Sequence, residues 1–205
     1  MSATYRAVPW GPLAALVVTS LAIMGSPGPA TISLTAAGSA FGFRRSLAYL
    51  AGIAAGTWIV LVAVAGGVTA ALLAVPGLRP LLVAGAAAYI VWLAYHIATA
   101  PPLAGGPAGA PPPRLAGGLL LGVANPKAWV AIAAVFASTR LAHNPGADAA
   151  SKVAVLTVMV AFINAAWLGV GASVAPLLRD PRRARVVNRC LALALLAATA
   201  LAVSR

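Results

Sequence analysis

Apolar runs of about 20 residues follow one another along nearly the whole chain, and they constrain its fold more than any other feature. A helix needs about 20 mostly apolar residues to cross the hydrocarbon core of a bilayer. Of the 205 residues, 62% are hydrophobic and 8% are charged, so too few polar side chains are present to cover a water-soluble surface. The sequence therefore predicts an all-α integral membrane protein.

The apolar runs predict six transmembrane helices. Residues 101–114 (PPLAGGPAGAPPPR) are too rich in proline and glycine for regular helix. This linker divides a single membrane domain, residues 1–205, into a first set of three helices at 11–100 and a second at 115–203. The six predicted helices are residues 11–41, 46–75, 80–100, 115–138, 153–177 and 186–203.

The net charge of +12 comes from 14 Lys and Arg side chains against 2 acidic ones. The basic residues lie in short connections between apolar runs, which favours contact with anionic lipid head groups over nucleic acid. One side of the predicted topology collects eight of these cations and the other side five. The positive-inside rule then predicts a multi-pass plasma-membrane protein with both termini outside.

The first 30 residues also resemble a secretory signal peptide, because Arg6 precedes a short apolar region at residues 12–24. However, helix-compatible sequence continues past Pro29 without a clear start of a mature chain. A first transmembrane helix is therefore the favoured interpretation.

Helix-breaking residues interrupt the first helix of each set of three, at residues 25–30 (GSPGPA) and at Asn125-Pro126. Proline lacks an N–H group and clashes with the preceding turn, so neighbouring backbone groups lose their partners. Because three is odd, the second set would enter the membrane in the opposite direction. The pattern predicts two inverted-topology three-helix repeats, with helices 1 and 4 broken and a binding site near the midplane. Two ordinary proline kinks are the alternative.

Each break exposes both ends of a helix. The half-helix that begins after a break presents free N–H groups and a positive dipole end, which suit a carboxylate. The half-helix that ends before it presents free carbonyls, near Met24 and Gly122, which suit an ammonium group. An amino acid carries both groups on one carbon, so the breaks suit a small zwitterionic substrate.

Lys127 is a charge in the middle of an apolar segment. It lies 12 residues after Leu115, about 18 Å along a helix. Both acids, Asp148 and Asp180, fall in predicted loops, at 139–152 and 179–185. An unpaired intramembrane lysine costs about 2.5–3.5 kcal/mol and usually marks a site or a pathway. We expect its partner to be water, backbone carbonyls or an anionic substrate group; extension along a tilted, water-lined segment is the alternative.

Polar residues in the other helices are weaker candidates for the site. Thr31, Thr35 and Ser39 share one helix face, where they either line a polar path or bond back to their own helix. Asn164, central in the fifth predicted helix, should face the bundle interior, in the cavity or in an interhelical hydrogen bond. The pairs with GxxxG spacing, Gly52 with Gly56 and Gly118 with Gly122, are expected to pack helices.

Groups for catalysis or cofactor binding are scarce in the sequence. Cys190 is the single cysteine, and His96 and His143 are isolated from one another. We find no nucleophile–base pair and no phosphate-binding loop. The sequence therefore predicts no cofactor, no metal site and no enzymatic activity.

Four stretches resemble the LysE/RhtB family of amino-acid exporters in order and spacing. They are SPGPAT at 26–31, GFRRSLAYLAGIAAG at 42–56, AAYIVWLAYHIATAP at 87–101 and GLLLGVANPKAW at 118–129. The resemblance implies a six-helix plasma-membrane exporter of amino acids or related small metabolites, driven by the proton-motive force. It places the family's two motifs on Pro27, Gly28 and Pro29, and on Asn125, Pro126 and Lys127.

One position departs from the family pattern. Many members carry Asn, Asp or Gln directly after Pro-Gly-Pro, where this chain has Ala30. That departure argues against a cationic substrate, and Lys127, as the only charge in the middle of a predicted span, favours a zwitterionic or anionic one.

The partners we expect are a small-molecule substrate and membrane lipids, and a homo-oligomer is left open. A non-transporting assembly or lipid-handling membrane protein of the same superfamily is the alternative function. A thiol-based redox enzyme is disfavoured because Cys190 is alone, and a metal exporter because the predicted spans lack carboxylates and paired thiols. The candidate substrate-binding residues are Pro27, Gly28, Pro29, Thr31, Thr35, Asn125, Pro126, Lys127 and Asn164.

Overall fold

The computed structural model describes residues 10–68 and 112–178 continuously, together with scattered positions within 71–99 and 180–197. The predicted helices at 80–100 and 186–203 and most of the linker at 101–114 lie outside the continuously described residues. All regular structure in the two continuous ranges is helical. The elements are α1 (Trp10–Met24), α2 (Pro29–Phe41), the 3-10 turn η1 (Arg44–Ser46), α3 (Leu47–Ala65), α6 (Leu115–Ala124), α7 (Pro126–Ser138) and α8 (Pro145–Leu178).

Both predicted helix breaks are confirmed. The first predicted helix is the pair α1 and α2, bent by 69°, and the fourth is the pair α6 and α7, bent by 56°. The helices at Arg44–Ala65 and Pro145–Val174 are unbroken and are long and apolar enough to cross a membrane. The described residues thus hold two unbroken candidate spans and two broken ones.

Two predicted helix boundaries are wrong, each for a local reason. The second predicted helix extends to residue 75, but α3 ends at Ala65, because a turn follows in which Gly67 adopts a φ of 84°. Residues 145–152 were predicted as loop but begin α8. The Asn144 side chain accepts hydrogen bonds from the Gly146 and Ala147 N–H groups, at 2.9 and 3.1 Å, so it caps this helix before Pro145.

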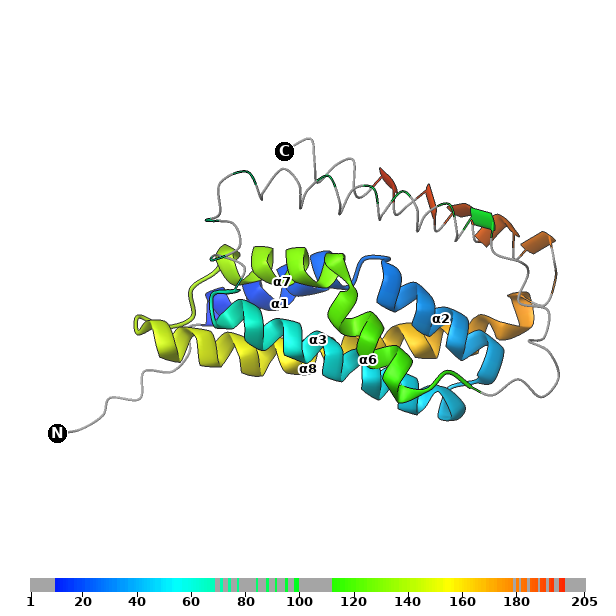
Figure 1. The fold of residues 1–205 in the computed structure, drawn as a ribbon, viewed down its shortest axis with the longest axis horizontal. Coiled ribbons are helices and arrows are strands. Elements are labelled where there is room, and N and C mark those ends of the chain that lie inside the picture. The colour runs from blue at the N-terminus through cyan, green and yellow to red at the C-terminus, as the bar shows by residue number, and fades with distance from the viewer. Residues whose placement is uncertain are drawn as a thin grey trace.

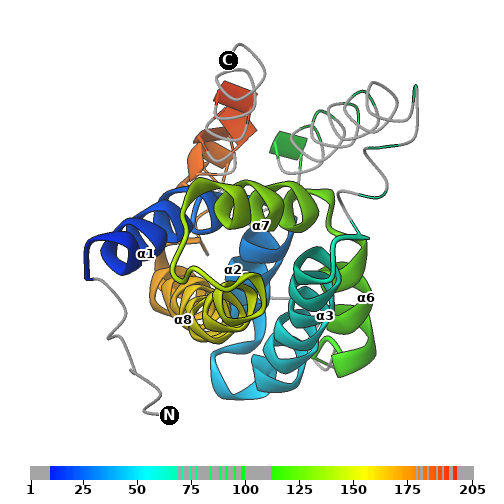
Figure 2. The ribbon, with the colours of Figure 1, turned by 90° about the vertical axis from the view of Figure 1, so that its left-hand side faces the viewer.

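The two halves of the described chain run in opposite directions (Figure 1). The pair α1–α2 advances from left to right, whereas α6–α7 returns from right to left, and α3 and α8 are likewise antiparallel. Exchanging the halves also relates several of the helix pairs that are in contact, although α3 packs on α6, and α2 on α8, far more extensively than their counterparts do. The packing of α3 on α6 corresponds to that of α8 on α1, and the packing of α2 on α8 to that of α7 on α3. Figure 2 shows α3 beside α6 and α1 beside α7 in an end-on view.

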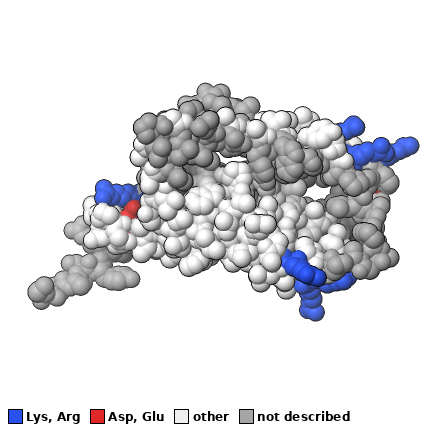
Figure 3. Space-filling model, in the orientation of Figure 1, with Lys and Arg blue, Asp and Glu red and all other residues white. Residues whose placement is uncertain are grey.

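On the face shown in Figure 3, the Lys and Arg side chains that can be seen lie toward the ends of the described bundle. Between them is an uncharged surface, as expected of helices that face lipid. Two hydrophobic clusters fill the interior on either side of the breaks. One is built around Leu16, Val60 and Ile132, and the other around Leu34 and Ile53.

Glycines bring α3 and α6 into direct backbone contact. A Cβ added to Gly118 would overlap the Tyr49 carbonyl oxygen, and one added to Gly122 would lie 2.6 Å from the Ile53 carbonyl oxygen. Gly52 and Gly56 meet the backbone of α6 just as closely. These contacts confirm that the GxxxG pairs pack helices.

Replacing Gly118 with alanine should therefore destabilise the protein by about 1–3 kcal/mol, since backbone atoms must separate to admit the new methyl group. Gly117→Ala is the matched control, because a Cβ there would sit 3.9 Å from the Tyr49 ring, an ordinary contact. Thermal unfolding in detergent compares the two. Equal melting temperatures would contradict the proposed close packing.

A mostly buried ion pair fastens the start of α8 to the end of α7. The Asp148 carboxylate lies 2.8 Å from Lys152 Nζ and accepts N–H bonds from Leu141 and Ala142, at 2.6 and 3.2 Å. Lys152 also donates to the Phe136 carbonyl oxygen at 2.8 Å. The two side chains are 15% and 5% exposed. Neither residue therefore behaves as the loop charge that the sequence predicted.

Asp148→Ala should destabilise the fold by about 3 kcal/mol, because it strands the Lys152 ammonium group in a largely buried place. The exposed pair of Asp180 and Arg183, 3.7 Å apart, supplies the control. Asp180→Ala should change stability by less than about 1 kcal/mol. Comparable losses from the two variants, measured by thermal unfolding, would refute a structural role for the buried pair.

Candidate substrate site between the helix breaks

Lys127 joins the two breaks. Its ammonium group donates to the backbone carbonyls of Ser26 and Pro27, the latter at 3.1 Å, so α7 is tied to the loop between α1 and α2. Backbone carbonyls are one of the three partners that the sequence predicted for this lysine. An ammonium has three donors, and these two bonds leave the third free among the described residues.

Gly28 leaves space for the Lys127 side chain because it has no Cβ. A Cβ added to Gly28 would lie 2.5 Å from Lys127 Cδ and 3.1 Å from Nζ. The φ of Gly28 is −170°, an extended conformation that any residue adopts. Glycine is therefore needed here for the close approach of the lysine and not for its backbone freedom.

Side chains satisfy several backbone groups at both breaks. The Asn125 side chain caps α7 by accepting from the Lys127 N–H at 3.2 Å, and Pro126 follows it at the first helical position. At the first break, Thr31 Oγ1 accepts from the Gly28 N–H at 2.8 Å. An indole N–H serves each break: Trp167 donates to Gly25 O at 3.0 Å and Trp129 to Val123 O at 2.9 Å.

Two N–H groups at the start of α2 remain unpaired. Among the described residues, neither the Ala30 nor the Thr31 N–H finds an acceptor. They lie at the positive end of a helix that begins with Pro29. Both residues also line a cavity, so this helix end offers a place for an anionic group.

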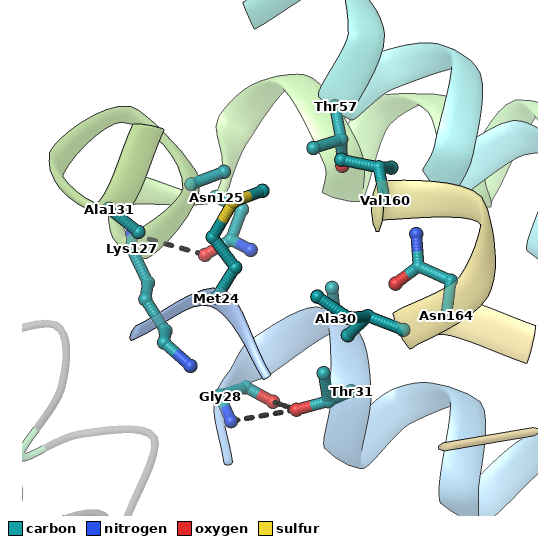
Figure 4. A pocket seen from close by; sticks show the side chains of 12 residues that line it. Met24, Gly28, Ala30, Thr31, Thr57, Asn125, Lys127, Ala131, Val160 and Asn164 are labelled. Carbon is teal, nitrogen blue, oxygen red and sulfur yellow. Dashed lines mark hydrogen bonds between the residues drawn. The ribbon is translucent and has the colours of Figure 1, made fainter. Parts of the chain in front are cut away.

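The cavity lies between the two breaks and the unbroken helices α3 and α8 (Figure 4). Its volume is about 50 Å³, enough for a few water molecules but well below the roughly 300 Å³ of a small-ligand pocket. The site must therefore widen before it can hold an amino acid. Its polar lining residues are Thr31, Thr57, Asn125, Lys127 and Asn164; the others are Met24, Gly28, Ala30, Ala128, Ala131, Val160 and Ile163.

The structure brings Gly28, Thr31, Asn125, Lys127 and Asn164 together around this cavity. The other predicted site residues do not line the cavity. Pro27 supplies a carbonyl to Lys127, and Pro29 and Pro126 begin the half-helices. Thr35 points elsewhere, since its hydroxyl bonds to the carbonyls of Thr31 and Trp167.

Thr57 and the aliphatic lining residues were not among the predicted site residues. Thr57 is the only serine or threonine in the 19-residue α3, and this isolation in an apolar helix was a usable signal. Met24, Val160 and Ile163 carried no such signal, because aliphatic residues fill every predicted span.

Two broken spans whose breaks meet at an internal cavity are the arrangement typical of α-helical membrane transporters. The family model described as LysE type translocator matches residues 21–204, so the chain belongs to that family. This confirms the resemblance drawn from the Pro-Gly-Pro and Asn-Pro-Lys motifs.

Individual relatives match over a shorter stretch. Proteins named cysteine/O-acetylserine efflux protein, from Salmonella typhimurium (strain LT2) and Escherichia coli (strain K12), are 41% identical to this chain over 76 residues. The matched stretch covers 37% of this chain and 39% of each relative. No solved structure matches the chain.

Proposed function

We propose that this protein is a secondary transporter that exports amino acids or related small zwitterionic metabolites across the plasma membrane, coupled to the proton-motive force. Its membership of the translocator family supports transport. The names of the relatives, which refer to efflux of cysteine and O-acetylserine, support an amino-acid substrate and outward transport. The observation that carries the proposal is the cavity between the breaks, lined by Lys127 and by Ala30 and Thr31, whose N–H groups have no acceptor among the described residues.

The substrate's carboxylate binds between the α2 N-terminus and Lys127. The Ala30 and Thr31 N–H groups supply two donors, and the third N–H of the Lys127 ammonium supplies another. These donors come from different halves of the protein, so a bound carboxylate links the halves.

The substrate's ammonium group binds to backbone carbonyls at the breaks. The carbonyls of Ser26 and Pro27 bind the Lys127 ammonium, and this contact supports the proposal that carbonyls near Met24 and Gly122, where the half-helices end, bind the substrate's ammonium. Lys127 is the only charged side chain among the described residues that line the cavity. Proton coupling therefore acts on this lysine or on the substrate itself.

The transport cycle exposes the cavity alternately to the two sides of the membrane. Residues 11–100 and 115–203 act as two repeats, joined by the linker at 101–114, that rock against one another around the cavity. Both termini face outward in this arrangement.

Efflux from proteoliposomes loaded with a labelled amino-acid mixture tests the proposal, with and without an imposed proton gradient. We expect selective loss of a few amino acids, faster when the gradient is present. If folded, inserted protein released no amino acid under either condition, the proposal would be refuted in favour of the non-transporting or lipid-handling alternative. Release that ignores the gradient would refute the proton coupling alone.

A further inference from the structure

Thr57 and Asn164 are buried polar side chains without a partner among the described residues. They are 7% and 5% exposed, and neither side chain forms a hydrogen bond with any described residue. Both line the cavity, Thr57 from α3 and Asn164 from α8. Burying a polar group without a hydrogen-bond partner is unfavourable, so such a group normally meets water or a ligand.

The free hydroxyl of Thr57 stands out from its counterparts in other helices. Ser20, Thr35 and Thr157 each donate to the carbonyl four residues earlier, at 2.6, 2.9 and 2.7 Å. Such bonding to the own helix is how hydroxyls are usually satisfied in apolar segments. The Thr57 hydroxyl makes no such bond and is therefore available to a molecule in the cavity.

The wall that carries these two side chains is uncharged. Figure 4 shows Thr57 and Asn164 on one side of the cavity and Lys127 on the other. Val160 and Ile163 fill the surface next to them. A hydroxyl and an amide can each donate and accept a hydrogen bond. Neither offers a counter-charge to a cationic or anionic group, whose desolvation in this place would be costly.

We propose that Thr57 and Asn164 are specificity-determining residues that bind the uncharged, hydrogen-bonding side chain of the substrate. The substrates are then short amino acids that carry a hydroxyl, thiol, amide or ester group. Aliphatic amino acids of the same size leave Thr57 and Asn164 unpaired, and charged ones lack a partner on this wall. This inference rests on the proposed function, because it assumes that an amino acid occupies the cavity.

Paired substrates of equal shape test the inference. Proteoliposomes are loaded with labelled threonine or valine, which differ by a hydroxyl in place of a methyl group, and initial efflux rates are compared. The native protein should prefer threonine by about tenfold or more, since a site built for a hydroxyl rejects the analogue that lacks it. Thr57→Val and Asn164→Leu should each lower this ratio several-fold, because threonine efflux falls more than valine efflux.

Two further variants sharpen the readout. Thr57→Ser keeps the hydroxyl and should restore the threonine preference. Thr157→Val is the matched control, because the Thr157 hydroxyl bonds to its own helix at an exposed position, so the ratio should not change.

The outcomes separate the inference from the function beneath it. Equal native rates for threonine and valine would overturn the inference and leave amino-acid export intact. If Thr57→Val and Asn164→Leu lowered the efflux of threonine and valine equally, these residues would serve the fold and not substrate discrimination. That result would also overturn the inference. Failure of the native protein to move any amino acid would overturn the proposed function, and the inference with it.

Discussion

Replacing Lys127 with alanine is expected to reduce export by about 100-fold or more, with expression and membrane insertion unchanged. The ammonium group has two carbonyl partners at the first break and is the only charged side chain among the described residues that line the cavity. A hydrogen bond to a charged group contributes about 1.5–3 kcal/mol, and losing two of them together with a carboxylate donor accounts for that factor. Initial efflux rates from proteoliposomes measure it.

Two companion variants identify which property of Lys127 matters. Lys127→Met keeps most of the side-chain length and removes the charge, so it should be as inactive as the alanine variant. Lys127→Arg keeps the charge with a different geometry and should retain partial activity. Near-normal efflux from the alanine or the methionine variant would remove the lysine from the mechanism.

Gly28→Ala is expected to reduce export by about tenfold with little change in stability. The new methyl group would lie 2.5 Å from Lys127 Cδ, so the flexible lysine must move away from the Ser26 and Pro27 carbonyls. One such charged hydrogen bond is worth roughly tenfold. Gly11→Ala is the control, because a Cβ there meets nothing within 4 Å.

The effect of Gly28→Ala should also depend on the lysine. In a Lys127→Ala background no long side chain remains to be displaced, so adding Gly28→Ala should have no further effect on efflux. Independent, multiplying effects of the two substitutions would show that Gly28 acts through something other than Lys127.

The sequence predicted the two breaks because proline acts locally, through its missing N–H and its clash with the preceding turn. It also placed Lys127 in the middle of the fourth predicted span, since residue count alone fixes the position along a helix. The capping of α8 by Asn144 was equally local and was overlooked, which is why residues 145–152 were predicted as loop.

The sequence could not predict which groups a side chain contacts on another helix of the bundle. Lys127 bonds to carbonyls 100 and 101 residues away in the chain, and nothing local specifies that contact. The same holds for the hydroxyls: Thr31 and Thr35 share a helix face, yet only Thr31 lines the cavity. Which hydroxyl faces the cavity depends on the packing of α2 against α8, and backbone contacts at Gly38 and Gly171 set that packing.

The central claim is that an amino acid crosses the membrane through the cavity between the two breaks. A single cysteine placed at Ala131, which lines the cavity and is 5% exposed, tests it in a Cys190→Ser background that lacks the native exposed thiol. Ala133→Cys, on the same helix but outside the cavity lining, is the control.

The measurement is the rate of labelling by a membrane-impermeant thiol reagent, applied from either side, with and without an exported amino acid. The account predicts that the cysteine at 131 reacts from both sides and that the amino acid slows the reaction, whereas the cysteine at 133 shows no such protection. A protein that exports amino acids while the cysteine at 131 stays unreactive, or reacts at a rate no substrate changes, would contradict the account.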